Sequence, residues 1–273
     1  MVELGHFAEA FLEAAPDAVL AVDESGEIIL VNMQAELLLG YSRQELWGRP
    51  LESLLAEPDG SLTRRSVGPH SIELLARHRE GKSVPVEVSL APVNIDERPY
   101  TIAIFRDLTE RRRLEENLHY LSTHDSMTGL ANRFAFDEAL ARLDEQGPHP
   151  VGVLMVDLDE LKRINDEQGH AAGDNMLRRV AEVLRATFRS DDVVARIGGD
   201  EFAVLTSGRD AESVEALGAR LADAVQQHNR EVDAPPLRLS IGVAIAETGE
   251  SISAALRDAD ERMYSMKRLH QGR

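Results

Sequence analysis

Carboxylates occupy two places where the sequence pattern opens a strand to solvent. Asp157 directly follows the continuous apolar run 151–156, and Asp200 and Glu201 stand within the stretch Arg196-Ile-Gly-Gly-Asp-Glu-Phe202. A continuous apolar run predicts a strand buried on both faces, and a carboxylate at its end can reach a ligand. Carboxylate oxygens suit Mg²⁺, and two such ions can activate a hydroxyl and stabilise a leaving phosphate. These residues therefore indicate metal-dependent phosphate chemistry.

Gly198 and Gly199 are expected to form a tight hairpin, because they lie between two β-prone runs at 192–197 and 202–206. Glycine tolerates the positive φ values that primed hairpin turns need. A backbone without a Cβ also lets a nucleotide approach closely. For this stretch alone, an acidic turn exposed to water is the alternative interpretation.

The order of the predicted elements brings the acidic positions together. From residue 151 onward a strand, helices, a hairpin, a helix, a strand and a final helix follow one another, which places the first strand beside the hairpin. Asp157 and Asp200 then converge, and the backbone carbonyl of Leu158 adds a third oxygen suited to Mg²⁺. Lys162 follows one helical turn later and supplies positive charge for a phosphate.

Composition excludes several classes of function. The 273 residues are enough for two domains, and the net charge of −18 argues against binding of nucleic acid or of an anionic membrane surface. The chain contains no cysteine, so disulfides, thiol catalysis and cysteine-linked cofactors are excluded. No apolar run is long enough to span a bilayer, and the N-terminus lacks the pattern of a signal peptide. We therefore expect a cytoplasmic protein.

Residues 1–106 predict one small domain of mixed structure. Helices are expected at 7–14 and 34–39, and strands at 19–23, 27–32, 71–76, 83–91 and 100–105. Gly40 is expected to cap the second helix. The strand at 83–91 alternates apolar and polar residues, which predicts one buried and one solvated face.

This order resembles a PAS sensor domain, and so do the short motifs Asp23-Glu-Ser-Gly26, Val31-Asn32, Gly40-Tyr41 and Arg106-Asp107-Leu-Thr109. The resemblance implies a five-stranded antiparallel sheet with helices on one face, often a small ligand and often a dimer. The segment between Leu51 and Ser71 is shorter than is usual in the family. The PAS ligand is left unknown: without cysteine no flavin photo-adduct forms, His70 or His78 could hold haem, and a domain used mainly for dimerisation is the alternative.

Residues 107–123 predict a helical linker. Asp107 or Thr109 can cap its start. Leu114, Leu118 and Leu121 have coiled-coil spacing over little more than one heptad. We favour a short parallel two-helix segment between two copies of the chain; packing of this helix on its own domain is the alternative.

Residues 124–273 carry several separate motifs. They are Asp157-Leu-Asp-Glu-Leu-Lys162, Asn165-Asp166, Gly169-His170, Gly173-Asp174 and Gly198-Gly-Asp-Glu-Phe202, preceded by His124-Asp125, Thr128-Gly-Leu130 and Asn132-Arg133. In order and spacing these motifs resemble the GGDEF domain of diguanylate cyclases. Helices are expected at 134–145, 176–188, 211–229 and from 251, and a strand at 237–245. The resemblance implies an α+β protein, in which the PAS domain and linker precede a GGDEF domain with a central mixed sheet surrounded by helices, as in nucleotidyl cyclases.

The resemblance to diguanylate cyclases also implies roles for individual residues. Asp157, the carbonyl of Leu158 and Asp200 would bind two Mg²⁺ ions per active site, and Asp200 or Glu201 would assist deprotonation of the attacking 3′-hydroxyl. The implied substrate contacts are Asn165 and Asp174 on the guanine edge, Lys162 and Lys267 on the phosphates, His170 beside the site, and Gly198 and Gly199 in the hairpin. A carboxylate accepts from both N1–H and the exocyclic amine of guanine, so Asp174 favours two GTP molecules.

The implied reaction requires a second copy of the chain. Condensing two GTP into cyclic di-GMP releases two pyrophosphates and forms two equivalent phosphodiester bonds. Because one half-site holds one GTP, two domains must face each other across a two-fold axis. We therefore expect a homodimer whose PAS domain and linker control the orientation of the pair.

Arg189 and Asp192 match the spacing of the family's product-inhibition site, where a guanidinium and a carboxylate would grip guanine bases of cyclic di-GMP. A charged loop after a helix is the alternative.

The sequence departs from the family pattern in two places. Leu161 stands where phenylalanine is usual. The last helix ends Met266-Lys-Arg-Leu-His-Gln-Gly-Arg273 instead of Ala-Lys-x-x-Gly-Arg, without the usual closing strand, so the second phosphate contact is left between Arg268 and Arg273. Two other functions remain: a GGDEF domain that binds GTP or cyclic di-GMP without turnover, and a cyclase that makes a cyclic mononucleotide.

Overall fold

The computed structural model describes residues 2–56, 71–146, 150–208 and 210–271. The chain divides into two compact units, residues 1–116 and 117–273. Within the described ranges, no helix is both long enough and apolar enough to cross a membrane.

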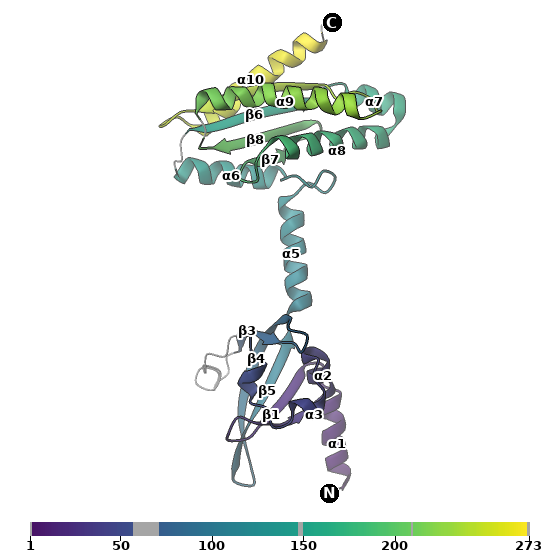
Figure 1. Cartoon of the computed structure of the whole chain (residues 1–273), viewed down its shortest axis with the longest axis vertical. Coiled ribbons are helices and arrows are strands. Elements are labelled where there is room, and N and C mark those ends of the chain that lie inside the picture. The colour runs from purple at the N-terminus through teal and green to yellow at the C-terminus, as the bar shows by residue number, and fades with distance from the viewer. Residues whose placement is uncertain (1, 57–70, 147–149, 209, 272–273) are drawn as a thin grey trace. The chain divides into compact units, whose positions relative to one another are not determined.

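The first unit is built on a five-stranded antiparallel sheet with the order β2-β1-β5-β4-β3 (Figure 1). The strands are β1 (Ala18–Val22), β2 (Ile28–Val31), β3 (Ile72–Arg77), β4 (Ser83–Ile95) and β5 (Arg98–Asp107). In β4, Val86, Val88 and Leu90 are buried and Ser89 is exposed, which confirms the predicted alternation. The shorter elements are α1 (Val2–Glu13), α2 (Met33–Leu39), α3 (Arg43–Leu46) and the 3-10 turn η1 (Leu51–Leu54), and residues of α2, α3 and η1 share one core with the sheet.

Asn32 ties the start of this unit together. Its fully buried side chain accepts the N–H of Val19 at 2.9 Å and of Ala35 at 3.0 Å, so it joins β1 to the first turn of α2. Its amide nitrogen donates to the carbonyls of Leu12 and Asp17. A buried amide whose donors and acceptor are all bonded holds these segments in one arrangement.

Two histidines of this unit bear on the haem alternative. His70 lies outside the described residues. The Nδ1 of His78 accepts the N–H of Glu80 at 3.2 Å, and the ring leaves no room for a Cβ on Gly40, whose φ of +73° caps α2 as predicted.

Helix α5 (Thr109–Thr123) joins the two units, and the Asp107 carboxylate accepts the N–H of Thr109 at 2.7 Å at its start. Leu114, Leu118 and Leu121 are 56%, 66% and 61% exposed. The alternative in which these leucines pack on their own domain is therefore wrong for this chain.

The second unit is built on a four-stranded sheet with the order β7-β8-β6-β9. Its strands, β6 (Val151–Leu158), β7 (Val193–Arg196), β8 (Glu201–Ser207) and β9 (Leu239–Ala246), pair antiparallel, and an isolated parallel bridge joins Ala131 to Ala195. The helices are α6 (Arg133–Gln146), α7 (Leu161–Gln168), α8 (His170–Thr187), α9 (Ala211–Glu231) and α10 (Ile252–Gln271). The prediction of an α+β protein is confirmed.

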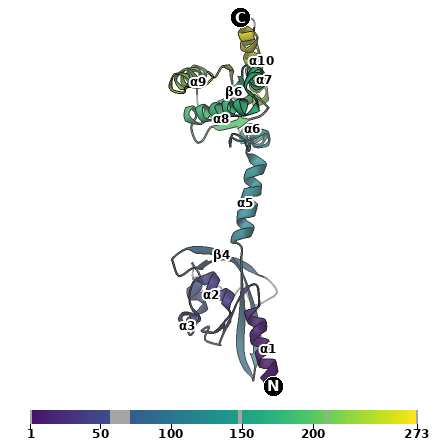
Figure 2. The same ribbon diagram turned by 90° about the vertical axis from the view of Figure 1, so that its right-hand side faces the viewer.

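Helices cover both faces of this sheet (Figures 1 and 2). Leu154, Val156 and Leu158 of β6 share a core with α8 and α9, whereas Val151 and Val153 share the opposite core with α6 and α10. Side chains along a strand point alternately to its two faces, so the fully buried β6 divides its residues between two cores. This confirms the prediction from its continuous apolar run.

Helix α8 begins earlier than predicted, at His170 instead of Met176. The prediction rests on apolar residues at helical spacing, and these begin only at Leu177. Gly169 has a φ of +85° and separates α7 from α8. Gly173 lies inside α8, where a Cβ would meet the side chain of Asn165.

Candidate active site

Asp157 lies at the end of β6, on the face that α10 covers. Val151, Val153 and Met155 form the row before it in the core beneath α6 and α10, and the period of two along a strand makes Asp157 the next member. Asp157 is 2% exposed, and the Lys267 ammonium of α10 donates to its Oδ2 at 2.7 Å.

The surroundings of Asp157 disfavour its charge. Burial raises the pKa of Asp157, the hydrogen bond from Lys267 opposes this rise, and the negative charges of Asp200 and Asp159 add to it. Burial alone would lower the pKa of Lys267, but its hydrogen bond with Asp157 and the nearby carboxylates raise it. The pair therefore combines a firmly charged ammonium with a carboxylate that is costly to ionise.

One oxygen of Asp157 has no partner. Its Oδ1 is buried and makes no hydrogen bond to any residue in the described part of the chain. An unsatisfied buried carboxylate oxygen costs free energy unless a ligand binds it. A divalent cation with oxygen coordination fits this atom, so the residues present suit Mg²⁺.

The hairpin of β7 and β8 brings further carboxylates to the same edge. The N–H of Leu158 donates to the backbone carbonyl of Asp200 at 2.9 Å, and Glu201 is the cross-strand partner of Asp157. The structure therefore places Asp157, Leu158, Asp200 and Glu201 together, as the order of the elements predicted.

The prediction that the two hairpin glycines supply positive φ values was wrong. Neither Gly198 nor Gly199 has a positive φ. Ile197 N–H and Gly198 N–H both donate to the carbonyl of Glu201, at 3.0 and 3.2 Å. A Cβ on Gly198 would come within 2.6 Å of the Glu201 carboxylate, so this glycine makes room for an acidic side chain. Gly199 has open space around it.

Arg196 braces the hairpin. Its guanidinium donates to the backbone carbonyl of Gly199 at 2.7 Å and to the Asp125 carboxylate at 3.1 Å, and its side chain is 11% exposed. Burial would raise the pKa of Asp125, but hydrogen bonds from Thr128 and the Arg196 ion pair lower it. Sequence reasoning quoted both Asp125 and Arg196 within motifs and gave neither a role.

The helices α7 and α8 carry polar groups that no protein partner occupies. Lys162 and His170 are exposed and Asn165 and Asp174 are half-buried, and none of these four side chains makes a hydrogen bond within the described residues. A Cβ on Gly173 would lie 2.0 Å from the amide oxygen of Asn165, so the close approach of α7 to α8 depends on this glycine. These groups are free to contact a ligand.

Arg189 and Asp192 form a closed turn. The carboxylate of Asp192 accepts the backbone N–H of Arg189 at 2.9 Å, and the backbone N–H of Asp192 donates to the carbonyl of Arg189. The Arg189 side chain is exposed, and its guanidinium makes no hydrogen bond within the described ranges.

At the end of α10, Lys267 reaches Asp157 and Arg268 is exposed, whereas Arg273 lies outside the described residues. Sequence reasoning missed three residues beside Lys267, namely Asp159, Ser240 and His270, which are bonded to one another. The alternation along β6 pointed to Asp159, since it follows Asp157 by two positions.

The first unit is thus an antiparallel sheet backed by helices, and the second is a sheet at whose edge carboxylates gather beside a lysine. The family model described as "Diguanylate cyclase, GGDEF domain" matches residues 122–273, and a PAS domain model matches residues 16–110. The chain therefore belongs to the GGDEF-domain family of diguanylate cyclases and carries a PAS domain.

Relatives of known name match almost the whole chain. The probable diguanylate cyclase DgcE of Escherichia coli (strain K12) is 30% identical over 279 residues, covering 96% of this chain and 25% of DgcE. The cyclic di-GMP phosphodiesterase PdeR of the same strain is 29% identical over 294 residues, covering 97% of this chain and 42% of PdeR. The chain thus spans less than half the length of either relative.

A solved structure matches the second unit. The coiled coil and GGDEF domain of DgcB from Caulobacter crescentus, in complex with c-di-GMP, is 30% identical with a TM-score of 0.50, covering 58% of this chain and 89% of that one.

Proposed function

We propose that this chain condenses two molecules of GTP into cyclic di-GMP, with release of two pyrophosphates, under the control of its PAS domain. The observation that carries the proposal is the buried Oδ1 of Asp157, which has no partner among the described residues and lies near Asp200 of the hairpin and Lys267 of α10. Family membership supports the same reaction.

Asp157, the carbonyl of Leu158 and Asp200 are the groups that would hold Mg²⁺. When bound, two Mg²⁺ ions supply charge that activates a hydroxyl and stabilises a leaving pyrophosphate. Lys267 contributes a fixed positive charge beside the same carboxylate, because its pKa is raised. Lys162, exposed on α7, adds a second cation for the phosphates.

The chemical step joins the two nucleotides. The 3′ oxygen of one GTP forms a bond to the α-phosphorus of the other, and the bond from that phosphorus to the pyrophosphate oxygen breaks. The hydroxyl proton passes to Asp200 or Glu201, the carboxylates of the hairpin. Among the residues that the structure describes, the side chains of Asn165 and Asp174 have no hydrogen-bond partner, which supports a role in binding the guanine edge.

A dimer follows from the symmetry of the product. Each domain offers one such edge, so two copies related by a two-fold axis are needed to form both bonds. The exposed leucines of α5 supply an apolar stripe on which two parallel helices would pack, and the PAS domain would set their orientation.

Product inhibition would act through Arg189. Its unpaired guanidinium stands on a turn that the Asp192 carboxylate closes, and a planar guanidinium fits the acceptor edge of guanine. Because Asp192 bonds to the backbone of Arg189, we assign it to shaping the turn as well as to holding the base.

One observation favours a second function. PdeR, a phosphodiesterase, matches this chain over nearly its full length, so a domain of this kind can occur in a protein named for a different activity. The competing function is a domain that binds GTP or cyclic di-GMP without turnover.

Mass analysis of the product tests the proposal. Purified full-length chain is incubated with GTP and Mg²⁺, and we expect cyclic di-GMP and pyrophosphate in a ratio of one to two. Bound nucleotide without turnover would support the binding function, and a cyclic mononucleotide would identify a different cyclase. Either result would overturn the proposal.

A further inference from the structure

Asp157 of β6 and Asp159, which follows the strand, lie against the last turns of helix α10. Asp157 lies near the end of β6 and Asp159 in the turn that follows it, and both carboxylates bond to side chains of α10. Lys267 and His270 are three positions apart on a helix and therefore share a face. Lys267 bonds to Asp157 at 2.7 Å, and the Nδ1 of His270 lies 2.8 Å from the Asp159 carboxylate.

Asp159 is held from two sides. It is 5% exposed, and the hydroxyl of Ser240, on β9, donates to both of its carboxylate oxygens at 2.9 and 3.0 Å. His270, whose side chain is 45% exposed, closes the open side when its proton is on Nδ1. The neutral imidazole suffices for this bond, so it requires no charge on His270.

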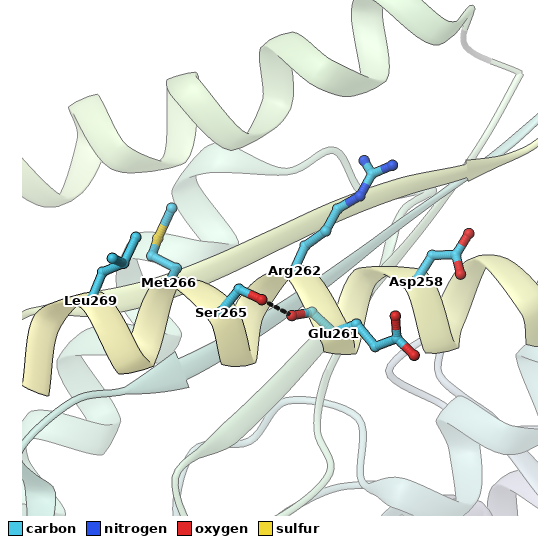
Figure 3. A pocket seen from close by; sticks show the side chains of 6 residues that line it. All are labelled: Asp258, Glu261, Arg262, Ser265, Met266 and Leu269. Carbon is cyan, nitrogen blue, oxygen red and sulfur yellow. Dashed lines mark hydrogen bonds between the residues drawn. The ribbon is translucent and has the colours of Figure 1, made fainter.

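Helix α10 lies directly on the neighbouring strand β9. A Cβ on Gly242 would come within 1.9 Å of the carbonyl oxygen of Ala259, so the two backbones touch. The guanidinium of Arg262 donates to the carbonyl of Val243, and the sulfur of Met266 accepts the N–H of Ile241. Figure 3 shows Arg262 and Met266 on α10, with Leu269 farther along the same helix. Beyond Met266, the described contacts that fix α10 to the sheet are those of Lys267 and His270.

We propose that His270 is a positioning residue for the reaction. By binding Asp159, it anchors the last turn of α10 to the end of β6 and so holds the Lys267 ammonium at the edge where the triphosphate binds. This inference rests on the proposed function, because it assigns Lys267 to the phosphates of GTP.

The His270 contact acts on Lys267 for two reasons. Without it, the last turn of α10 keeps no described side-chain bond to the sheet beyond Lys267 itself, and helix ends fray when their contacts are lost. Removing His270 also leaves the buried Asp159 with Ser240 alone. The charge of Asp159 then competes with that of Asp157 for the ammonium of Lys267, since both carboxylates raise the pKa of Lys267.

Binding of a GTP analogue measures this role without turnover. The probe is GTP whose α–β bridging oxygen is replaced by methylene, titrated calorimetrically in Mg²⁺ against the full chain. We expect His270→Ala to weaken binding about five- to tenfold, an effect the size of one ordinary hydrogen bond. His270→Asn should recover most of the affinity, because its amide nitrogen can replace Nδ1. In turnover, the KM for GTP should rise more than kcat falls.

A double mutant separates positioning from simple stability. In a Lys267→Ala background, His270→Ala should cause no further loss of affinity, since the group it positions is gone. Leu269→Ala, which shortens a 72% exposed side chain in the same turn, is the matched control and should bind as the original chain does.

Independent losses in the double mutant, or an equal loss in Leu269→Ala, would overturn the inference. Absence of analogue binding by the unaltered chain would overturn it together with the proposed function. Binding without cyclic di-GMP formation would overturn the proposed function alone and leave the anchoring measurable.

Discussion

Replacing Gly173 by alanine should weaken GTP binding without unfolding the domain. The new Cβ would stand 2.0 Å from the amide oxygen of Asn165 and 3.0 Å from a methyl group of Leu161, so the Asn165 side chain must turn away. If that side chain binds the guanine edge, one hydrogen bond is lost, worth about 1–1.5 kcal/mol, and KM for GTP should rise about five- to tenfold.

Stability should change little, because two effects oppose each other. Alanine is favoured over glycine within a helix by about 1 kcal/mol. Moving Asn165 off its preferred rotamer costs about 0.5–1.5 kcal/mol. The net effect is within about 1 kcal/mol, which shifts Tm by roughly 2–4 °C at most in a unit of this size.

The measurement compares steady-state KM and Tm of three variants. Asn165→Ala should raise KM as Gly173→Ala does, and combining the two should add nothing. Gly5→Ala is the matched control, because Gly5 lies in helix α1 with open space around its Cα, so it should leave KM unchanged. A Gly173→Ala variant with the original KM, beside an Asn165→Ala variant with a raised one, would refute the steric link.

Three further predictions concern Asp157 at the sheet edge, Arg189 in the turn before β7, and Leu118 in the linker helix α5. The folded-state pKa of Asp157 is raised, so its contribution to stability is present below its unfolded pKa and is lost as pH rises through the folded value. Asp157→Asn should therefore raise Tm by a few degrees at pH 7 in EDTA while abolishing product, and Glu145→Gln, at an exposed acid, should do neither. Mg²⁺ should then raise Tm of the original chain and not of Asp157→Asn. Arg189→Ala should relieve inhibition by added cyclic di-GMP at least tenfold whereas Arg178→Ala should not; unchanged inhibition would remove the assignment. A cysteine introduced at Leu118, which is 66% exposed, should crosslink two chains, and a failure to do so would contradict the parallel pairing.

The sequence predicted what depends on local pattern. The apolar run before Asp157 predicted a strand buried on both faces, and all eight residues of β6 are buried. The order of elements placed the hairpin beside that strand, and Glu201 pairs with Asp157. In the first unit, the alternation along β4 and the cap at Gly40 were equally local and were confirmed.

The sequence could not predict what depends on space between elements. No helix was predicted at Gly173, and the side chain that a Cβ there would meet, that of Asn165, comes from another helix. Gly198 was assigned a positive φ, whereas its role is to leave room for Glu201. At both positions a neighbouring side chain, and not the backbone conformation, leaves no room for a Cβ.

The sequence also did not predict contacts between residues that are far apart along the chain. His270 was seen as part of a departure from the family pattern, and nothing local links it to Asp159, which lies 111 positions earlier. Arg196 and Asp125 were likewise quoted in separate motifs 71 positions apart. The alternation of β6 could have singled out Asp159, but its partners come from β9 and α10, whose placement the sequence leaves open.

The bond between Lys267 and Asp157 spans 110 positions, and this separation fixes when the edge is completed during synthesis. A ribosome makes Asp157 and Asp159 well before the residues of α10, and a domain generally folds as a unit. Until α10 has been made, Asp157 lacks the ammonium of Lys267 and Asp159 lacks the imidazole of His270. The bond between Lys267 and Asp157, and with it the site proposed to hold a triphosphate, therefore forms only after α10 has been made.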